Sequence, residues 1–154
     1  MNESWASSDH ARRTMRANKS RDTKPERLVR SILHAHGLRY RTHFRPVLEV
    51  RRTADIVFTR QRLAVFIDGC FWHACPEHFI SPKTNGSYWA SKIDGNKRRD
   101  VATDDYLREA GWTVLRFWEH ETPSSAADAI EGQVALLRQT VQSVARKSTP
   151  RRES

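Results

Sequence analysis

Both cysteines of the chain lie between residues 68 and 78, together with two histidines, two carboxylates and an adjacent pair of aromatic residues. Thiolates and imidazoles bind zinc, and a histidine or a carboxylate can transfer a proton. The rings of Phe71 and Trp72 stand among these polar groups, where neighbouring side chains of an extended segment cannot both point into a core. Residues of such different chemistry are seldom gathered for packing alone, so this segment is the first candidate for a functional site.

The cysteines and histidines offer more zinc ligands than a tetrahedral site can use. The candidates are Cys70, His73, Cys75, His78 and the more distant His120. Their spacing is not that of a zinc finger, and it does not decide which histidine is left over. A histidine outside the zinc site would suit proton abstraction from water, because its pKa lies near the working pH.

Two carboxylates are predicted to meet in a β-hairpin. The apolar runs 54–58 and 63–67 are separated by four polar residues, a pattern typical of two paired strands. A turn at the middle of this loop would place Asp55 opposite Phe66, with Asp68 two residues farther along the same face. Such a diagonal pair, roughly 7–8 Å apart, can help to hold Mg²⁺. Each aspartate alone is more simply interpreted as a turn former at a strand end.

A capping box predicts a helix that starts after Thr23. Glu26 stands three residues after Thr23, Pro25 suits the first turn, and Gly37 is a natural stop. The predicted apolar face consists of Leu28, Val29, Ile32 and Leu33. Capping alone would account for Glu26.

The rest of the chain alternates between strands and helices. Residues 38–44 have an extended pattern, residues 113–118 form a third apolar strand, and residues 87–110 form a polar helix that ends at Gly111. Helical spacing after Pro123 predicts a final helix packed on the core through Ile130, Val134, Leu137, Val141 and Val144. Strands between helices around a central hairpin indicate an α/β fold with a mixed β-sheet flanked by helices.

The charge of the chain favours a polyanionic partner. Its 27 Lys and Arg residues outnumber 18 Asp and Glu residues, which gives a net charge of +9, and nucleic acid is the commonest polyanion for a basic domain. We expect a single domain at 23–146, between a basic N-terminal arm (1–22) and a disordered basic tail (147–154). A solvated surface with basic ends is the simpler alternative. No apolar run approaches the roughly 20 residues that span a bilayer, so we expect a cytoplasmic protein without a membrane partner.

Together these residues resemble the very-short-patch repair (Vsr) endonucleases. In chain order, the motifs that carry the resemblance are Met15-Arg16, Ser20-Arg21-Asp22-Thr23, Ala54-Asp55, Asp68-Gly69-Cys70-Phe71-Trp72-His73, Cys75-Pro76-Glu77-His78, Tyr88-Trp89, Lys92-Ile93, Asn96, Arg99-Asp100, Gly111-Trp112 and Trp118-Glu119-His120-Glu121. The resemblance implies a restriction-endonuclease-like fold with a structural zinc site. It implies Mg²⁺-dependent hydrolysis that nicks one strand of duplex DNA 5′ of the thymine in a T·G mismatch, of the kind left by deamination of 5-methylcytosine. A monomeric bacterial protein associated with the nucleoid is the corresponding expectation.

The resemblance also implies catalytic roles by position. Asp55 would be the central Mg²⁺ ligand, with the main-chain carbonyl of Ile67 beside it. His73 would be the catalytic histidine, supported by a hydrogen bond with Asp100, and Glu26 would contribute from the first helix. From its neighbours in the sequence alone, Asp100 is interpreted as part of a solvated ion-pair face.

Zinc and DNA contacts follow from the resemblance in the same way. The structural zinc would be held by Cys70, Cys75, His78 and His120. The residues expected to contact DNA are Phe71, Trp72 and Trp89 as wedges beside the mismatch, Met15 on the minor-groove side, and Lys92 and Asn96 at the mismatched pair. The chain departs from the family pattern at Asp68, at His120, and at Ala74 and Pro76 within the segment that is histidine-rich in the family.

Two other functions remain open at this point. A zinc-stabilised DNA-binding module without catalysis would explain the charge, the rings and the Cys/His cluster, but would leave Asp55, Asp100 and Glu26 without a role. A zinc hydrolase would need an open coordination position on the zinc ion, and its activity would not require added magnesium.

Overall fold

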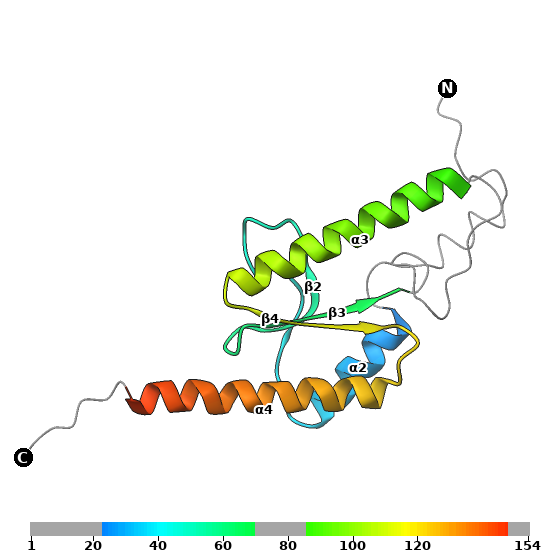
Figure 1. Cartoon of the computed structure of the whole chain (residues 1–154). Coiled ribbons are helices and arrows are strands. Elements are labelled where there is room, and N and C mark those ends of the chain that lie inside the picture. The colour runs from blue at the N-terminus through cyan, green and yellow to red at the C-terminus, as the bar shows by residue number, and fades with distance from the viewer. Residues whose placement is uncertain (1–22, 70–85, 148–154) are drawn as a thin grey trace, which may run out of the picture.

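The computed structural model describes residues 23–69 and 86–147, whose elements form three layers (Figure 1). In chain order the elements are α2 (Lys24–Ala35), β1 (Arg41–Phe44), β2 (Ala54–Phe58), β3 (Leu63–Asp68), α3 (Gly86–Glu109), β4 (Thr113–Trp118) and α4 (Pro123–Lys147). The sheet is the middle layer, with α3 over one face and α2 and α4 over the other. The predicted α/β fold with a mixed sheet between helices is confirmed.

The sheet has the strand order β1-β2-β3-β4. Strand β2 is antiparallel to both β1 and β3, whereas β3 and β4 are parallel. Helix α3 lies in the connection between the two parallel strands, which need such a crossover. The hairpin pairs Ile56 with Val65, Val57 with Ala64 and Phe58 with Leu63, so the predicted pairing of the two apolar runs is confirmed.

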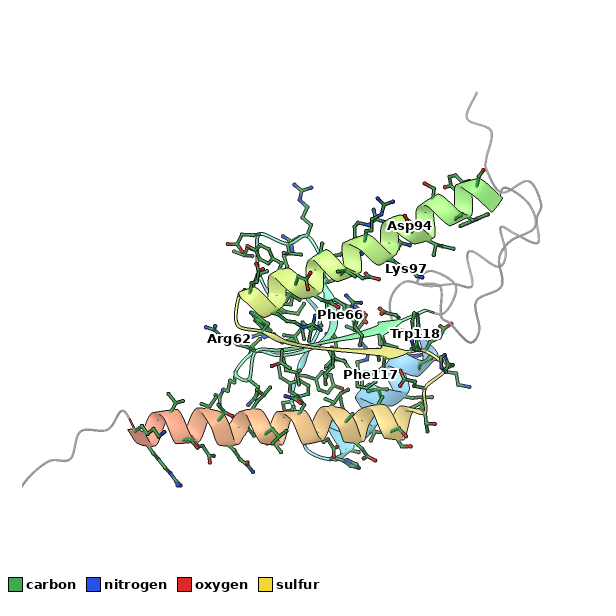
Figure 2. All side chains as sticks on the ribbon, in the orientation of Figure 1. Arg62, Phe66, Asp94, Lys97, Phe117 and Trp118 are labelled. Carbon is green, nitrogen blue, oxygen red and sulfur yellow. The ribbon has the colours of Figure 1, made fainter. Side chains whose placement is uncertain are left out.

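Strands β2 and β3 are buried on both faces, which accounts for their almost continuous apolar sequences. On the face toward α2 and α4, the core includes Leu33, Ile56, Val65 and Ile130. On the face toward α3, it includes Val57, Ala64, Phe66 and Leu107. Figure 2 shows Phe66 on the α3 side of the sheet and Phe117 on the α4 side. This packing on both faces gives the polar groups at the strand ends a fixed support.

The helix boundaries follow the local signals in the sequence. The backbone N–H of Glu26 donates to the Thr23 hydroxyl at 3.4 Å, and the Thr23 N–H donates to Oε2 of Glu26 at 3.3 Å, so the capping box is formed. Gly37 and Gly111 follow α2 and α3 with φ angles of 85° and 86°, in the left-handed region that glycine enters without steric cost.

The final helix differs from its prediction in one respect. Ile130 and Val134 are buried and Leu137 is partly buried, but Val141 and Val144 are 55% and 63% exposed. The apolar spacing continues past the point where the sheet and α2 end, because α4 is longer than the face that it covers (Figure 1). The expected packing of Val141 and Val144 on the core is therefore wrong. No helix within the described ranges is long and apolar enough to cross a membrane.

Candidate active site

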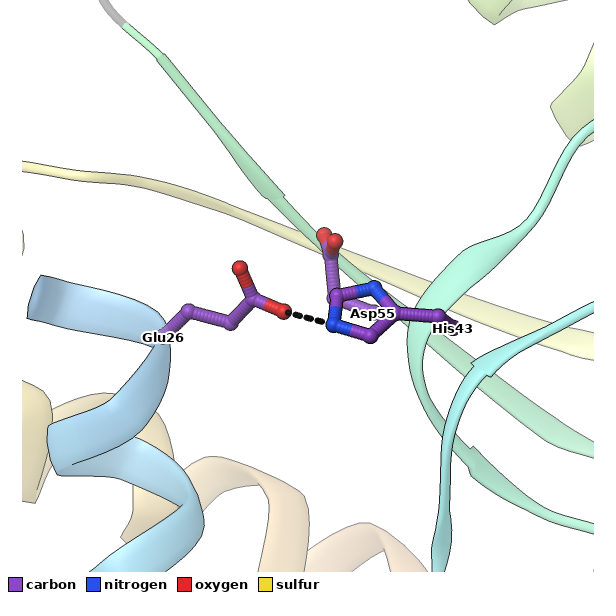
Figure 3. A group of neighbouring side chains, drawn as sticks. All are labelled: Glu26, His43 and Asp55. Atoms are coloured by element: carbon purple, nitrogen blue, oxygen red, sulfur yellow. Dashed lines mark ion pairs between the residues drawn. The ribbon is translucent and has the colours of Figure 1, made fainter. Parts of the chain in front are cut away.

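Three side chains from three different elements meet beside the sheet: Glu26, His43 and Asp55 (Figure 3). Glu26 lies in the first turn of α2, His43 on β1 and Asp55 on β2. The register of β1 and β2, which pairs Thr42 with Ile56 on one side and Phe44 with Ala54 on the other, brings His43 opposite Asp55. One oxygen or nitrogen atom from each side chain lies within 4.8 Å of the other two, which is close enough for the three groups to bind one ion.

The carboxylate of Glu26 is 2% exposed, and its two oxygens have different surroundings. Oε2 accepts the capping hydrogen bond from Thr23. Oε1 lies 3.4 Å from Nε2 of His43 and 4.0 Å from Nη1 of Arg30, and it has no hydrogen-bond partner among the described residues. Leaving a buried carboxylate oxygen without a partner is energetically costly, so this atom is suited to a bound cation.

Asp55 is held at the end of the hairpin by the backbone of the neighbouring strand. The N–H of Ile67 donates to Oδ2 of Asp55 at 2.7 Å. Burial raises the pKa of Asp55 to about 7; the Ile67 N–H opposes this rise, the nearby carboxylates of Glu26 and Asp68 add to it, and His43 opposes it. A divalent cation would favour the ionised form of this carboxylate.

His43 is the residue of the group that the sequence did not identify. It appeared as one of the polar residues that alternate along an extended segment. The side chain is only 10% exposed, and the backbone has a φ of 47°, which is in the left-handed region. Its proximity to Asp55 depends on the register between β1 and β2, which the sequence does not specify across the nine residues that separate the strands.

The donor set fits a divalent cation. Two carboxylates, one of them with a buried oxygen that lacks a hydrogen-bond partner within the described part of the chain, provide the negative charge and oxygen ligands that Mg²⁺ and Mn²⁺ prefer. The structure brings Glu26 and Asp55 together, and the capping role of Glu26 is confirmed.

A second polar group lies on the α3 side of the sheet and is centred on Arg116 of β4. Its Nη1 donates to both oxygens of Asp68, at 2.9 and 3.1 Å, and its Nη2 donates to Asp104 of α3 at 2.7 Å. Its guanidinium carbon lies 4.2 Å from the centre of the Phe66 ring. The carboxylate of Asp68 is thus bound by a cation of the protein itself. The idea that Asp68 joins Asp55 in holding Mg²⁺ stays a prediction, and in this structure the Asp68 carboxylate is paired with Arg116.

Asp100 belongs to the edge of this second group. Its Oδ1 lies 3.9 Å from Nη2 of Arg116 and 4.0 Å from Nη2 of Arg52. The side chain is 16% exposed. The interpretation of Asp100 as part of a solvated ion-pair face holds for the ion pairs and is wrong for the solvation, since the carboxylate lies between two arginines and is little exposed.

Comparison with known proteins gives a consistent answer. The family described as DNA mismatch endonuclease Vsr matches residues 7–77. The Type II nicking enzyme V.NaeI of Lentzea aerocolonigenes is 48% identical over 120 residues, which are 77% of this chain and 72% of that protein. The DNA mismatch endonuclease Vsr of Escherichia coli strain K12 is 35% identical over 108 residues, or 70% of this chain and 67% of that protein. The chain belongs to the Vsr family of DNA mismatch endonucleases. As a Vsr endonuclease it acts on DNA.

The residues that the Vsr resemblance assigns to DNA lie partly on α3. Trp89 is 9% exposed near the start of that helix, and its ring meets Tyr88 edge to face at a centroid distance of 5.4 Å. Nζ of Lys92 lies 5.9 Å from the centre of the Tyr88 ring. The side-chain oxygen of Asn96 accepts a hydrogen bond from Arg99.

The remaining predicted site residues of the Vsr endonuclease are placed only in part. His120 follows β4 and is exposed. The predictions for Met15, Cys70, Phe71, Trp72, His73, Cys75 and His78 concern positions outside the described residues. Of the predicted catalytic set, the described part of the chain therefore shows Glu26 beside Asp55 on one side of β3 and Asp100 beside Arg116 on the other.

Proposed function

We propose that this Vsr endonuclease nicks one strand of duplex DNA 5′ of the thymine in a T·G mismatch, with Mg²⁺ as its cofactor. The observation that carries the catalytic part of the proposal is the convergence of Glu26 and Asp55, with a buried Glu26 oxygen for which the described residues provide no hydrogen-bond donor. The printed names of relatives such as V.NaeI, a nicking enzyme, support cleavage of a single strand. The mismatch is supported by the family description.

Asp55 and Glu26 are the side chains that would hold the cation. The main-chain carbonyl of Ile67 is a further ligand in this proposal. Its N–H is directed at Asp55, and the N–H and C=O of one strand residue point toward the same neighbouring strand, which supports this assignment. A bound Mg²⁺ supplies positive charge that polarises the scissile phosphate and lowers the pKa of a water molecule.

His73 is the proposed proton-transfer group. It would accept the proton of the attacking water or protonate the leaving oxygen, and Asp100 would orient it through a hydrogen bond. The position of Asp100 supports this role, because its carboxylate faces the sheet beside Arg116 rather than lying on the outer face of α3. The two arginines near Asp100 keep negative charge at this position favourable.

Selectivity for the mismatch would come from the cost of opening the base stack. Unstacking costs a few kcal/mol, and the cost is lowest where pairing is already poor. Phe71, Trp72 and Trp89 are the proposed wedges, with Met15 on the minor-groove side and Lys92 and Asn96 at the mismatched pair. Because Trp89 is 9% exposed, its insertion into DNA would require the start of α3 to rearrange around it.

The proposal includes a structural zinc ion on Cys70, Cys75, His78 and His120. Such a site would link the segment after β3 to the turn after β4. Asp68 and Trp118, which pair at the ends of those two parallel strands, support this link. His120 lies two residues beyond Trp118, which supports its assignment as the distal ligand. A monomeric cytoplasmic protein with a restriction-endonuclease-like fold completes the proposal.

A nicking assay on a plasmid with one T·G pair tests the function. With Mg²⁺ we expect one nick 5′ of the thymine, no nick in the matched T·A plasmid, and no nick after Mg²⁺ is omitted. His73→Ala should bind the mismatched duplex without cutting it. Glu26→Gln should lose most of its activity and keep its fold, since glutamine also completes a capping box but lacks the charge needed for the cation. Asp94→Asn, an exposed position on α3, is the matched control.

The same assay separates the rival functions. Mismatch binding without any nick, under every metal condition, would support the non-catalytic DNA-binding module. Nicking that persists without Mg²⁺ and stops when zinc is removed would support a zinc hydrolase. Measurement of about one zinc ion per chain, lost from a Cys70→Ser, Cys75→Ser double variant, tests the structural zinc separately.

A further inference from the structure

We propose that His43 is a third protein ligand of the cation held by Asp55 and Glu26, and that the centre therefore binds Mn²⁺ more tightly than Mg²⁺. This inference rests on the proposed cation site and adds a residue that the resemblance does not assign to it. The ligand class follows from the chemistry of the group: two carboxylates and one imidazole.

Geometry is the first support for His43 as a ligand. Figure 3 shows its ring beside the Glu26 and Asp55 carboxylates, with Nε2 directed at Glu26. Nε2 lies 3.4 Å from Oε1 of Glu26, and the three potential ligand atoms are mutually within 4.8 Å. Ligands at about 2.0–2.2 Å from a metal lie roughly 3–4 Å from each other, so small side-chain adjustments would suffice.

The second support is the surplus of acceptors in a buried place. Glu26 is 2% exposed, and Oε1 receives no hydrogen bond from the residues described. His43 could simply offer a proton to this oxygen, but the Nε2–Oε1 contact does not meet hydrogen-bond geometry. A buried carboxylate oxygen without a hydrogen bond from the described residues, with an imidazole nitrogen 3.4 Å away, is suited to a shared cation.

The third support is the backbone of His43. Its φ of 47° is uncommon for a residue other than glycine, and such conformations are costly and tend to persist at functional sites. His43 lies within β1, and its backbone has a left-handed conformation. With this conformation its imidazole lies beside Glu26 and Asp55.

The imidazole changes which ion the site prefers. Mg²⁺ takes oxygen ligands in near-ideal octahedral geometry and keeps several waters. Imidazole suits the first-row transition ions, and carboxylates suit Mg²⁺ and Mn²⁺ alike. Mn²⁺ is the ion that accepts both kinds of donor, so nitrogen ligation by His43 should favour Mn²⁺ without excluding Mg²⁺.

Electron paramagnetic resonance of Mn²⁺ bound to the full-length protein tests the ligand directly. Pulsed measurements should show a ¹⁴N coupling in the wild type and in His34→Asn, an exposed histidine on α2 that serves as the matched control. The coupling should be absent in His43→Asn, in which asparagine tolerates the left-handed backbone. The coupling should also disappear in Asp55→Asn, which assigns it to this site rather than to another Mn²⁺ position.

Binding constants give the second measurement. Titration with Mn²⁺, with the free ion measured by its electron paramagnetic resonance signal, should show an affinity at least about tenfold lower for His43→Asn. Replacing residues that only hydrogen-bond to metal ligands already lowers metal affinity about 10–100-fold. Mg²⁺ should displace Mn²⁺ only at a concentration at least about tenfold higher. Circular dichroism melts confirm that His43→Asn is folded.

Two outcomes would overturn the proposal. In the first, the Mn²⁺ signal of the wild type depends on Asp55 but shows no ¹⁴N coupling. The site would then have oxygen ligands only, and His43 would be a charge partner of Glu26. Equal Mn²⁺ affinity in the wild type and His43→Asn, the second outcome, would lead to the same conclusion. The proposed nicking activity is judged separately, because ¹⁴N coupling without any nick would refute the T·G endonuclease proposal and leave the ligand assignment standing.

Discussion

Glu26 divides two functions between its two carboxylate oxygens. One oxygen completes the cap of α2, and the other is directed toward His43 and Asp55. The helix start and the candidate cation site therefore share one side chain. A substitution to alanine would remove both, so only the glutamine variant separates the loss of charge from the loss of the cap.

The raised pKa of Asp55 makes the stability of the cation-free protein depend on pH. The unfolded chain releases this proton near the ordinary value of 3.8, whereas the folded protein holds it up to about pH 7. The resulting stability is present below about pH 4 and is lost as the pH rises through 7. Asp55→Asn is neutral at every pH and lacks this dependence.

We therefore expect the free energy of unfolding of Asp55→Asn to rise relative to that of the wild type as the pH rises from 4 to 8. One pKa unit corresponds to about 1.4 kcal/mol, so the change in the stability difference should be on the order of 2–4 kcal/mol. Urea unfolding in buffers without added divalent cations measures it. A stability difference that stays constant over this pH range would contradict the raised pKa. The same variant should not nick DNA.

At this scale the sequence identified some site residues and missed others. Asp55 could be proposed as a cation ligand from its place in a hairpin, whereas the capping box indicated only a helix cap for Glu26, whose site role came from the resemblance to the Vsr endonucleases. His43 could not be proposed, because its role depends on pairing between β1 and β2 across a long connection. The role of Arg116 was missed for a related reason: its partners Asp68 and Asp104 are 48 and 12 residues away in the sequence.

Among the elements, Arg116 joins β4 to β3 and α3. Its guanidinium donates to Asp68 and Asp104 and stacks on the ring of Phe66. Asp68 is the last residue of β3, and Asp104 faces the sheet from α3. The parallel strand pair and the helix that crosses between its strands are therefore held together by one cation.

Replacing Arg116 with methionine should lower the free energy of unfolding by about 3–5 kcal/mol, because buried carboxylates would lose their counter-charge. Arg98→Met is the control: Arg98 and Asp94 pair on the exposed face of α3, with side chains 76% and 61% exposed. That change should cost less than about 1 kcal/mol. Thermal unfolding of both variants measures the difference, and equal effects would refute the structural role of Arg116.

The predictability of the elements differed according to the range of their contacts. The capping box, the hairpin and the glycine stops are local, and each of them was predicted from neighbouring residues and is confirmed. The second half of α4 was assigned to the core because its apolar spacing is regular. Periodicity gives the face of a helix but not the length of the surface that it meets, so Val141 and Val144 were misplaced.

For the whole molecule, the net charge of +9 is the property most relevant to DNA. Neutralising phosphates releases condensed counterions, with a slope of roughly −0.9 per contact in a plot of log affinity against log salt. This contribution does not depend on base sequence. It should therefore act equally on matched and mismatched duplexes.

Binding of T·G and T·A duplexes to His73→Ala, measured by fluorescence anisotropy between about 50 and 200 mM salt, should give two steep lines of the same slope. The T·G line should be displaced toward tighter binding by a constant factor. Lines that diverge with salt would mean that mismatch recognition itself depends on additional phosphate contacts. Lines without slope would refute the electrostatic role of the basic charge.

The length of α4 has a further consequence. Its buried residues, from Ala126 to Val134, all lie in the first half of a helix that runs to Lys147. The second half therefore depends on its own backbone hydrogen bonds, and short helices in isolation are only marginally stable in water. Its amide protons should exchange rapidly with solvent through local fraying. The amide protons of the first half should exchange more slowly, because their exchange requires the sheet to open.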